Sequence, residues 1–107
     1  MVSYKLTEGK GRTRVSLLAE DIGDGQIVLI NNENAHIGAV ALGEYDFGHE
    51  RSSVSVITRL GHKDDFIAQK AAYLISKRLK KPVCVIAGVH VDNITEAEIS
   101  KILENSF

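Results

Sequence analysis

The residues best suited to chemistry precede one long helical pattern in the middle of the chain. They are Arg59, His62 and Lys63. A helix start offers unpaired backbone amides and the positive end of the helix dipole, and these three side chains add positive charge. The residues therefore predict an anion site suited to phosphate. The competing interpretation is that Asp64 and Asp65 already neutralise this helix end and the basic groups are solvated.

A second polar set, His90 and Asp92, follows an apolar run that starts at Val83. If the strand ending near Leu60 and the strand starting at Val83 are joined by a right-handed parallel crossover, both end at the same edge of the sheet. Ligands of such sheets bind outside the carboxyl ends of the strands. We therefore expect His90 and Asp92 to lie beside the basic residues at the helix start.

The helix that must position these groups is predicted from its first turn at Asp64 to the proline at position 82. Its apolar residues recur at helical spacing and form one stripe: Ile67, Ala71, Leu74, Ile75 and Leu79. Pro82 ends the helix because it disfavours helical geometry in the preceding residue and has no amide to donate. The apolar run from Val83 to Val91 then predicts a strand covered on both faces.

Five strands are predicted before the helix, at Val2–Glu8, Arg12–Glu20, Gln26–Ile30, His36–Leu42 and Ser53–Leu60. Asp24 and Gly25 predict a hairpin turn, and residues 43–52 a long polar loop. In the fourth strand, Gly38 and its small neighbours favour close approach by another group. That group is either a ligand or a tightly packed helix, and both interpretations stay open.

The end of the chain predicts one more helix. Residues 95–98 form a capping box, and Ile99, Ile102 and Leu103 follow at helical spacing. The predicted order is β-β-β-β-β-α-β-α: an α+β fold with five N-terminal, mainly antiparallel strands, then helix–strand–helix. The length fits a single domain over residues 1–107.

Other reactive side chains favour less specific interpretations. His62, Asp64, His90 and Asp92 could gather around zinc or iron, but no tight ligand spacing supports a metal site. His36, at a strand start, fits an edge or hydrogen-bonded residue better than a ligand. The predicted loop holds Tyr45 and Phe47 near His49 and Arg51, which could stack on a planar ligand or fold over the sheet edge. Cys84 is predicted to be a buried, unreactive thiol.

Composition excludes several classes of function. The 13 basic and 14 acidic residues give a net charge of −1, so no overall field attracts nucleic acid or anionic membrane. The single cysteine excludes an internal disulfide and suits a reducing compartment. No apolar run approaches the roughly 20 residues of a membrane span, and the first residues lack a signal core. We expect a soluble cytoplasmic protein with neither nucleic acid nor membrane as partner.

Three segments resemble a known family: HIGAVAL at His36–Leu42, GHKDDFIAQKAA at Gly61–Ala72 and AGVHVDNITEAEI at Ala87–Ile99. Together they are similar to the small D-subunit family of bacterial gallate and hydroxyarylic acid decarboxylases, described as prenylated-flavin chaperone-like. The resemblance implies a fold related in outline to proteasome assembly chaperones. It also implies an accessory role, because the large subunit of such decarboxylases carries out the chemistry on prenylated FMN.

The leading hypothesis is a non-catalytic protein that binds or delivers prenylated FMN, or FMN, to the large subunit of a UbiD-type reversible aromatic acid decarboxylase. The cofactor-binding residues we predict from the matched segments are Arg59, His62 and Lys63 for the phosphate, His36, His90 and Asp92 for polar contacts, and the small-sided strand from Gly38 for an apolar slot. An assembly module without a small ligand is the alternative, followed by a small metal-dependent enzyme. A chain of this size often hides an apolar face by pairing, so we expect a homodimer.

Overall fold

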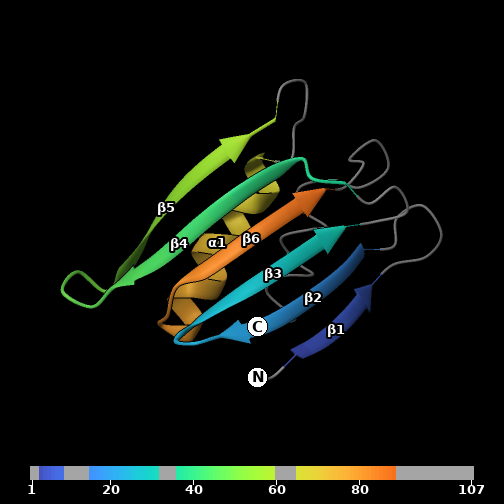
Figure 1. Cartoon of the computed structure of the whole chain (residues 1–107). Helices are drawn as coiled ribbons and strands as arrows, with labels where there is room; N and C mark the ends of the chain where they lie inside the picture. The colour runs from blue at the N-terminus through green and yellow to red at the C-terminus, as the bar shows by residue number, and fades with distance from the viewer. Residues whose placement is uncertain (1–2, 9–14, 32–35, 60–64, 89–107) are drawn as a thin grey trace.

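Six strands and one helix make up the part of the chain that the computed structural model describes, residues 3–8, 15–31, 36–59 and 65–88. In chain order the elements are β1 (Ser3–Glu8), β2 (Val15–Ile22), β3 (Gly25–Asn31), β4 (Ala39–Asp46), β5 (Arg51–Thr58), α1 (Asp65–Leu79) and β6 (Val83–Gly88). The strands form one sheet in the order β1-β2-β3-β6-β4-β5, and α1 lies across one face of it (Figure 1). The predicted order is confirmed as far as β6.

The last of the described strands, β6, enters the middle of the sheet. It pairs parallel with β3 and antiparallel with β4, and β4 pairs antiparallel with β5. Strands β5 and β6 therefore run in the same direction and end at the same edge, although β4 lies between them (Figure 1). The predicted convergence of their carboxyl ends is confirmed.

The helix buries the stripe that its sequence predicts. Ile67, Ala71 and Ile75 are fully buried, together with Ala68 and Ala72. The helix ends at Leu79, which is 37% exposed, because Lys80 adopts a positive φ of 55°. The Lys80 amide still donates to the Ser76 carbonyl (2.8 Å), which closes the last turn before Pro82.

Close packing between α1 and β4 accounts for the small side chains of that strand. Ala39 and Ala41 are fully buried. A Cβ atom added at Gly43 would fall on the carbonyl oxygen of Ala72 in the helix. The group that approaches this strand is therefore a helix, and the helix fills the apolar slot that we expected a ligand to occupy.

The β4–β5 hairpin differs from the predicted loop at residues 43–52. Strand β4 continues to Asp46 and β5 begins at Arg51, so only residues 47–50 form the turn. The prediction was wrong because the polar residues here belong to an edge pair of strands, where one face of each strand meets solvent. The predicted hairpin between β2 and β3 is present, but its turn is Gly23 and Asp24, one residue earlier than expected.

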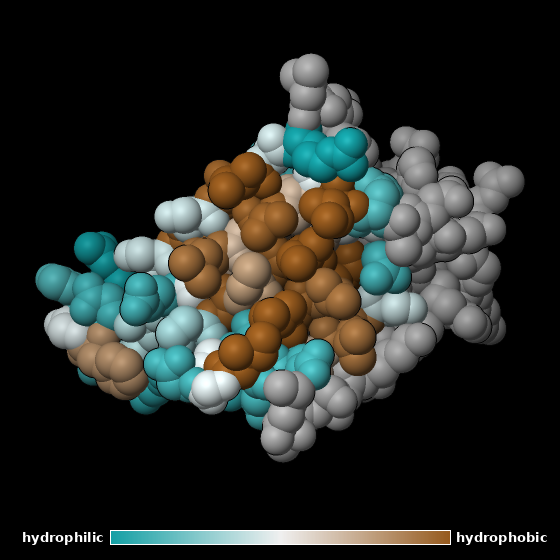
Figure 2. Space-filling view, in the orientation of Figure 1, coloured by the Kyte–Doolittle hydropathy of each residue, from teal (hydrophilic) through white to brown (hydrophobic). Residues whose placement is uncertain are grey.

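The sheet face opposite α1 is the second departure from prediction. Cys84 and Ile86 in β6 are half-buried, so this central strand is not covered on both faces. The exposed fractions of Leu42 and Ile57 on the same face are 52% and 75%. Figure 2 shows this face as a broad apolar surface over the middle of the sheet. A continuous apolar run can therefore mark a strand with one helix-covered face and one apolar open face.

The predicted C-terminal helix, with its capping box at residues 95–98, lies outside the described residues. This C-terminal helix therefore stays a prediction. Within the described ranges, α1 is too short and too polar to cross a membrane.

Candidate functional site

The edge where β5 and β6 end brings together several of the predicted site residues. The Gly38 amide donates to the Ala87 carbonyl (2.8 Å), and the Arg59 amide donates to the Gly38 carbonyl (3.0 Å). The backbone of Gly38 thus links the end of β6 to the residue that follows β5. The Arg59 side chain is exposed, and its Nη1 atom donates to the Ile37 carbonyl (2.9 Å), which holds the guanidinium group at this edge.

His36 lies at the same edge. A Cβ atom added at Gly88 would collide with the His36 carbonyl oxygen, so the last residue of β6 passes directly against the His36 backbone. Only glycine allows this approach. The His36 side chain is half-buried. The structure therefore brings three of the predicted site residues, His36, Gly38 and Arg59, to one edge.

Four other predicted residues lie outside the described part of the chain: His62, Lys63, His90 and Asp92. The first two come shortly after Arg59 in the sequence, and the other two come shortly after Gly88. Their part in a phosphate site stays a prediction. The metal alternative rested on His62, Asp64, His90 and Asp92, and across residues 3–8, 15–31, 36–59 and 65–88 no three His, Cys, Asp or Glu side chains gather.

A groove between the edge strand β5 and α1 adds a feature that the sequence analysis missed. Its volume is about 430 Å³, within the usual range of ligand pockets. The lining residues come from one strand and one helix face: Ser52, Val54, Phe66, Gln69, Lys70 and Tyr73. Phe66 lies in the first turn of α1, so the groove begins at the helix start. This end of the helix follows directly from the segment that contains Arg59.

Hydrogen bonds stabilise one end of the groove. The hydroxyls of Ser52 and Ser76 share a buried hydrogen bond, with 2.7 Å between their oxygen atoms. Ser76 also lies 3.3 Å from the Tyr73 carbonyl, within reach of a second hydrogen bond. The Lys77 ammonium lies 5.5 Å from the centre of the Tyr73 ring and 3.5 Å from its hydroxyl. The serine pair therefore joins the strand to the helix, and a cation lies over the Tyr73 ring.

The chemistry of this groove suits a planar anion. Phe66 and Tyr73 offer aromatic surface for stacking, and Lys70 contributes a positive charge between them. These three residues are spaced at i, i+4 and i+7, which places them on one side of a helix. That spacing was visible in the sequence. It was missed because sequence spacing does not pair this helix side with the strand that contains Val54, and because Ser52 was assigned to a loop.

The β4–β5 turn carries the aromatic residues that were considered for stacking. Tyr45 and Phe47 pack against each other edge to face, with 4.8 Å between ring centres, and the Lys80 ammonium lies 5.8 Å from the Tyr45 ring. They line a smaller pocket of about 240 Å³ at the opposite end of the helix from Phe66. The two rings thus make an aromatic contact with each other, and Phe47 remains 70% exposed.

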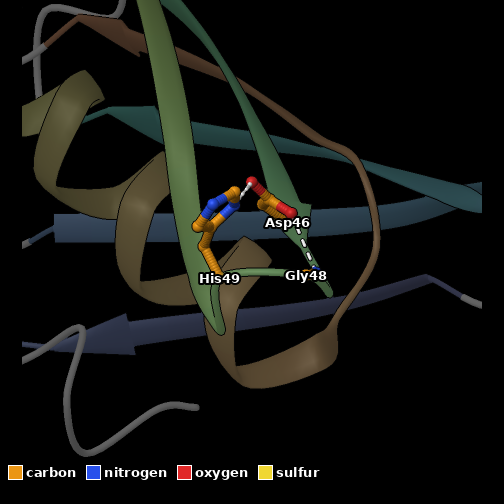
Figure 3. A network of polar contacts seen from close by, with 3 residues as sticks. All are labelled: Asp46, Gly48 and His49. Atoms are coloured by element: carbon orange, nitrogen blue, oxygen red, sulfur yellow. Dashed lines mark hydrogen bonds and ion pairs between the residues drawn. The ribbon is translucent and has the colours of Figure 1, made fainter.

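Asp46 organises this turn. Its carboxylate accepts a hydrogen bond from the Gly48 amide (2.9 Å) and contacts the His49 Nδ1 atom at 2.7 Å (Figure 3). The hydrogen bond with His49, followed by those of the Gly48 and His49 amides, lowers the pKa of Asp46 below its ordinary value. The arrangement is exposed and closes a hairpin, which is a structural role.

The class of protein follows from comparison with known families. The model of the prenylated flavin chaperone LpdD-like domain matches residues 9–106, so the chain belongs to this family. The resemblance expected from three sequence segments is therefore confirmed.

A particular relative supports the same assignment. The chain is 31% identical over 94 residues to Protein LpdD of Lactiplantibacillus plantarum (strain ATCC BAA-793 / NCIMB 8826 / WCFS1), and the match covers 88% of this chain and 69% of that protein.

A solved structure shares the fold. A chain in the crystal structure of a novel chaperone complex for yeast 20S proteasome assembly superposes with a TM-score of 0.58 at 15% identity. The match covers 99% of this chain and 93% of the other. The expected outline of a proteasome assembly chaperone is thus confirmed, as a likeness of fold.

Proposed function

We propose that this protein binds prenylated FMN and delivers it to the large subunit of a UbiD-type aromatic acid decarboxylase in the cytoplasm, without catalysing a reaction itself. The observation that carries the proposal is the family match over residues 9–106. The cofactor supplies the decarboxylation chemistry once it is in the large subunit, so this chain has only to bind, shield and release it.

The groove between β5 and α1 is the part of the described structure that best fits the flavin ring system. It is long enough to start at the first turn of α1 and reach Ser52, and it presents Phe66 and Tyr73 as stacking surfaces. Lys70 would contact the electron-rich edge of the ring or a ribityl oxygen. FMN alone offers the same ring and phosphate, so the groove accepts either form.

The phosphate would then lie at the edge where α1 begins. Arg59 is the described cation at this edge, and His62 and Lys63 follow it in the sequence. A phosphate near a helix start gains from unpaired amides and from charge-assisted hydrogen bonds. In this proposal His36, His90 and Asp92 make polar contacts nearby, and the backbone of Gly38 holds the edge together.

Anaerobic titration of the purified chain with prenylated FMN, followed by flavin fluorescence, tests the proposal. We expect saturable binding that weakens by about 1–2 kcal/mol, roughly tenfold, in Lys70→Ala and in Lys63→Ala, the scale of a charge-assisted contact. Arg78→Ala is the matched control, because Arg78 is an exposed cation of the same helix outside the groove. This variant should bind as the unmodified chain does.

The titration also distinguishes two questions, whether the chain binds flavin and whether the ring lies in the groove. Absence of binding to prenylated FMN and to FMN would overturn the carrier function. If Lys70→Ala and Tyr73→Ala bind as strongly as the Arg78→Ala control, the ring binds outside the groove. The carrier function would still stand.

A second function, an interaction module without a small ligand, is favoured by one observation, the open apolar face of the sheet. Its signature would be a stable complex with the decarboxylase large subunit that forms equally well with and without flavin.

A further inference from the structure

The outer edge of β5 carries a row of backbone groups that pair with no other strand in the described part of the chain (Figure 1). In the β4–β5 register Ala39 lies opposite Thr58, and the Arg59 amide donates to the Gly38 carbonyl. In an antiparallel pair, residues that bond to the neighbouring strand alternate with residues whose N–H and C=O groups point the other way. Arg59 and every second residue before it therefore bond to β4. The residues between them direct their amides and carbonyls outward: Ser52, Val54, Val56 and Thr58.

The side chains of the same outward-bonding residues face the helix side of the sheet. Ser52 and Val54 line the groove between β5 and α1, and Val56 packs against the core. Val54 and Val56 are half-buried, so each has apolar surface left to cover. A strand added about 4.8 Å from β5 would place the side chains opposite these residues on the same face. Those side chains would enter the groove.

Strand β5 lacks the features that usually protect an edge from pairing. Edge strands are commonly short or bulged, or they carry charges or proline. This strand has eight residues, and those after Arg51 include no charge and no proline. Its register with β4 is continuous from Arg51 to Thr58, so no bulge twists the edge away. A long, uncharged edge of this kind is suited to accept an extended segment.

The charge of the groove indicates what kind of segment fits. Its described lining residues include one cation, the half-buried Lys70, and no carboxylate. The Lys77 ammonium lies over the ring of Tyr73, which lines the same groove. Pairing with β5 of a second copy would bring the Lys70 side chains of both copies to the same face of the joined sheet, cation beside cation. Charge therefore favours an acidic segment of a different protein.

We propose that β5 accepts an extended, acidic segment of a partner protein as an additional strand, with alternate side chains of that segment in the groove. Backbone hydrogen bonds to the four outward-bonding residues would supply affinity, and the groove would supply specificity. A carboxylate in the groove would form a charge-assisted contact with Lys70. An apolar side chain two residues along the segment would cover Val54 or Val56.

Strand addition has a consequence for cofactor delivery, which rests on the function proposed above. The groove that receives the alternate side chains is the groove assigned to the flavin ring. The two ligands therefore exclude each other. Docking of the partner's segment would displace the ring when the partner is already in place, which couples docking to release.

The test is an NMR titration of the isotope-labelled chain, without flavin, with a capped nine-residue peptide. In this peptide valine and threonine alternate, and glutamate replaces the central valine. We expect the amides of Ser52, Val54, Val56 and Thr58 to become protected from hydrogen exchange. The amides of Ser53 and Ser55, which already bond to β4, should change little. Absence of this alternating protection up to millimolar peptide would overturn the proposal.

A control peptide removes the backbone donors and keeps the side chains. It is N-methylated at its valine and glutamate residues, whose amides face β5 when their side chains enter the groove. It should not bind. Equal binding of the two peptides would overturn strand addition. Protection of the outward amides that rises with chain concentration before any peptide is added would assign the edge to a second copy, and would also overturn the proposal.

A charge exchange tests the groove. Lys70→Glu should weaken binding of the glutamate peptide about tenfold or more and strengthen binding of a peptide with lysine at the central position. Arg78→Glu is the matched control, because it makes the same change at an exposed cation of α1 outside the groove. Equal weakening in both variants would show attraction by overall charge and overturn the groove as the binding site.

The peptide titration stands apart from the carrier function, because it contains no flavin. Adding FMN then tests the coupling, and we expect the apparent dissociation constant of the peptide to rise with FMN concentration. Simultaneous binding of peptide and FMN would overturn the displacement step while the strand site stands. A chain that binds the peptide and no flavin would overturn the carrier function alone.

Discussion

The two faces of the sheet differ most at β4. Under α1, the residues of this strand are Ala39, Ala41 and Gly43, which let the helix backbone come close to the sheet. On the opposite face, Leu42 in β4 and Ile57 in β5 project large side chains that stay half or more exposed. Small residues on β4 thus mark the place where the helix packs most closely. The large exposed residues mark a face that no described helix covers.

The two faces also differ in what each stabilises. Fully burying a large aliphatic side chain contributes about 1.5–3 kcal/mol. On the helix side that contribution belongs to folding, since Ile67 and Ile75 are buried within one chain. On the opposite face only part of it is realised, since Leu42 and Ile57 stay 52% and 75% exposed.

The largest expected effect comes from a large-to-small change on each side. Ile75→Ala should lower the free energy of unfolding by about 2–5 kcal/mol, because it leaves a cavity under the helix. Leu42→Ala should lower it less, because Leu42 is already 52% exposed in the folded chain. Urea unfolding of both variants measures the difference. Equal losses would remove the distinction between the faces.

An intermediate effect is expected where helix and sheet touch most closely. Gly43→Ala should destabilise the fold by about 1–3 kcal/mol, because the new methyl group must displace the Ala72 carbonyl and with it the helix. Gly48→Ala is the matched control, since its Cβ would meet only a side-chain oxygen of Asp46 in the exposed turn. Thermal unfolding of both variants measures the difference. Equal melting temperatures would show that the helix can shift without loss.

The smallest effect is expected beyond both faces, in the β4–β5 turn. In His49→Ala the pKa of Asp46 should rise toward its ordinary value, because the largest cause of its lowering is the hydrogen bond with His49. A carboxyl group with a lowered folded-state pKa stabilises the fold above its unfolded pKa. That stabilisation is lost as the pH falls through the folded pKa, so this variant should have less of it to lose as the pH falls below the ordinary value of 3.8. Titration of the Asp46 carboxyl resonance by NMR measures the shift. An unchanged pKa would show that the amides of the turn are sufficient.

Local patterns in the sequence predicted much of this structure. The stripe through Ile67, Ala71 and Ile75 predicted the helix, since helical spacing requires only neighbouring residues. The shared edge at which β5 and β6 end followed from the direction of two strands joined by that helix. The position of His36 and Gly38 at this edge depends on the pairing of β4 between those strands. The groove was not predicted, because it needs an edge strand and a helix that sequence spacing does not pair.

The sequence by itself determined the order of the strands and the helix as far as β6, the buried stripe of the helix, and the family to which the chain belongs. Only the tertiary structure decided that β4 lies between β5 and β6, that α1 covers the face with the alanines, and that the opposite face stays open. The physical reason is that a strand's alternation assigns its residues to two faces without saying what covers either. That choice depends on pairings between segments far apart in the chain, which a local pattern does not contain.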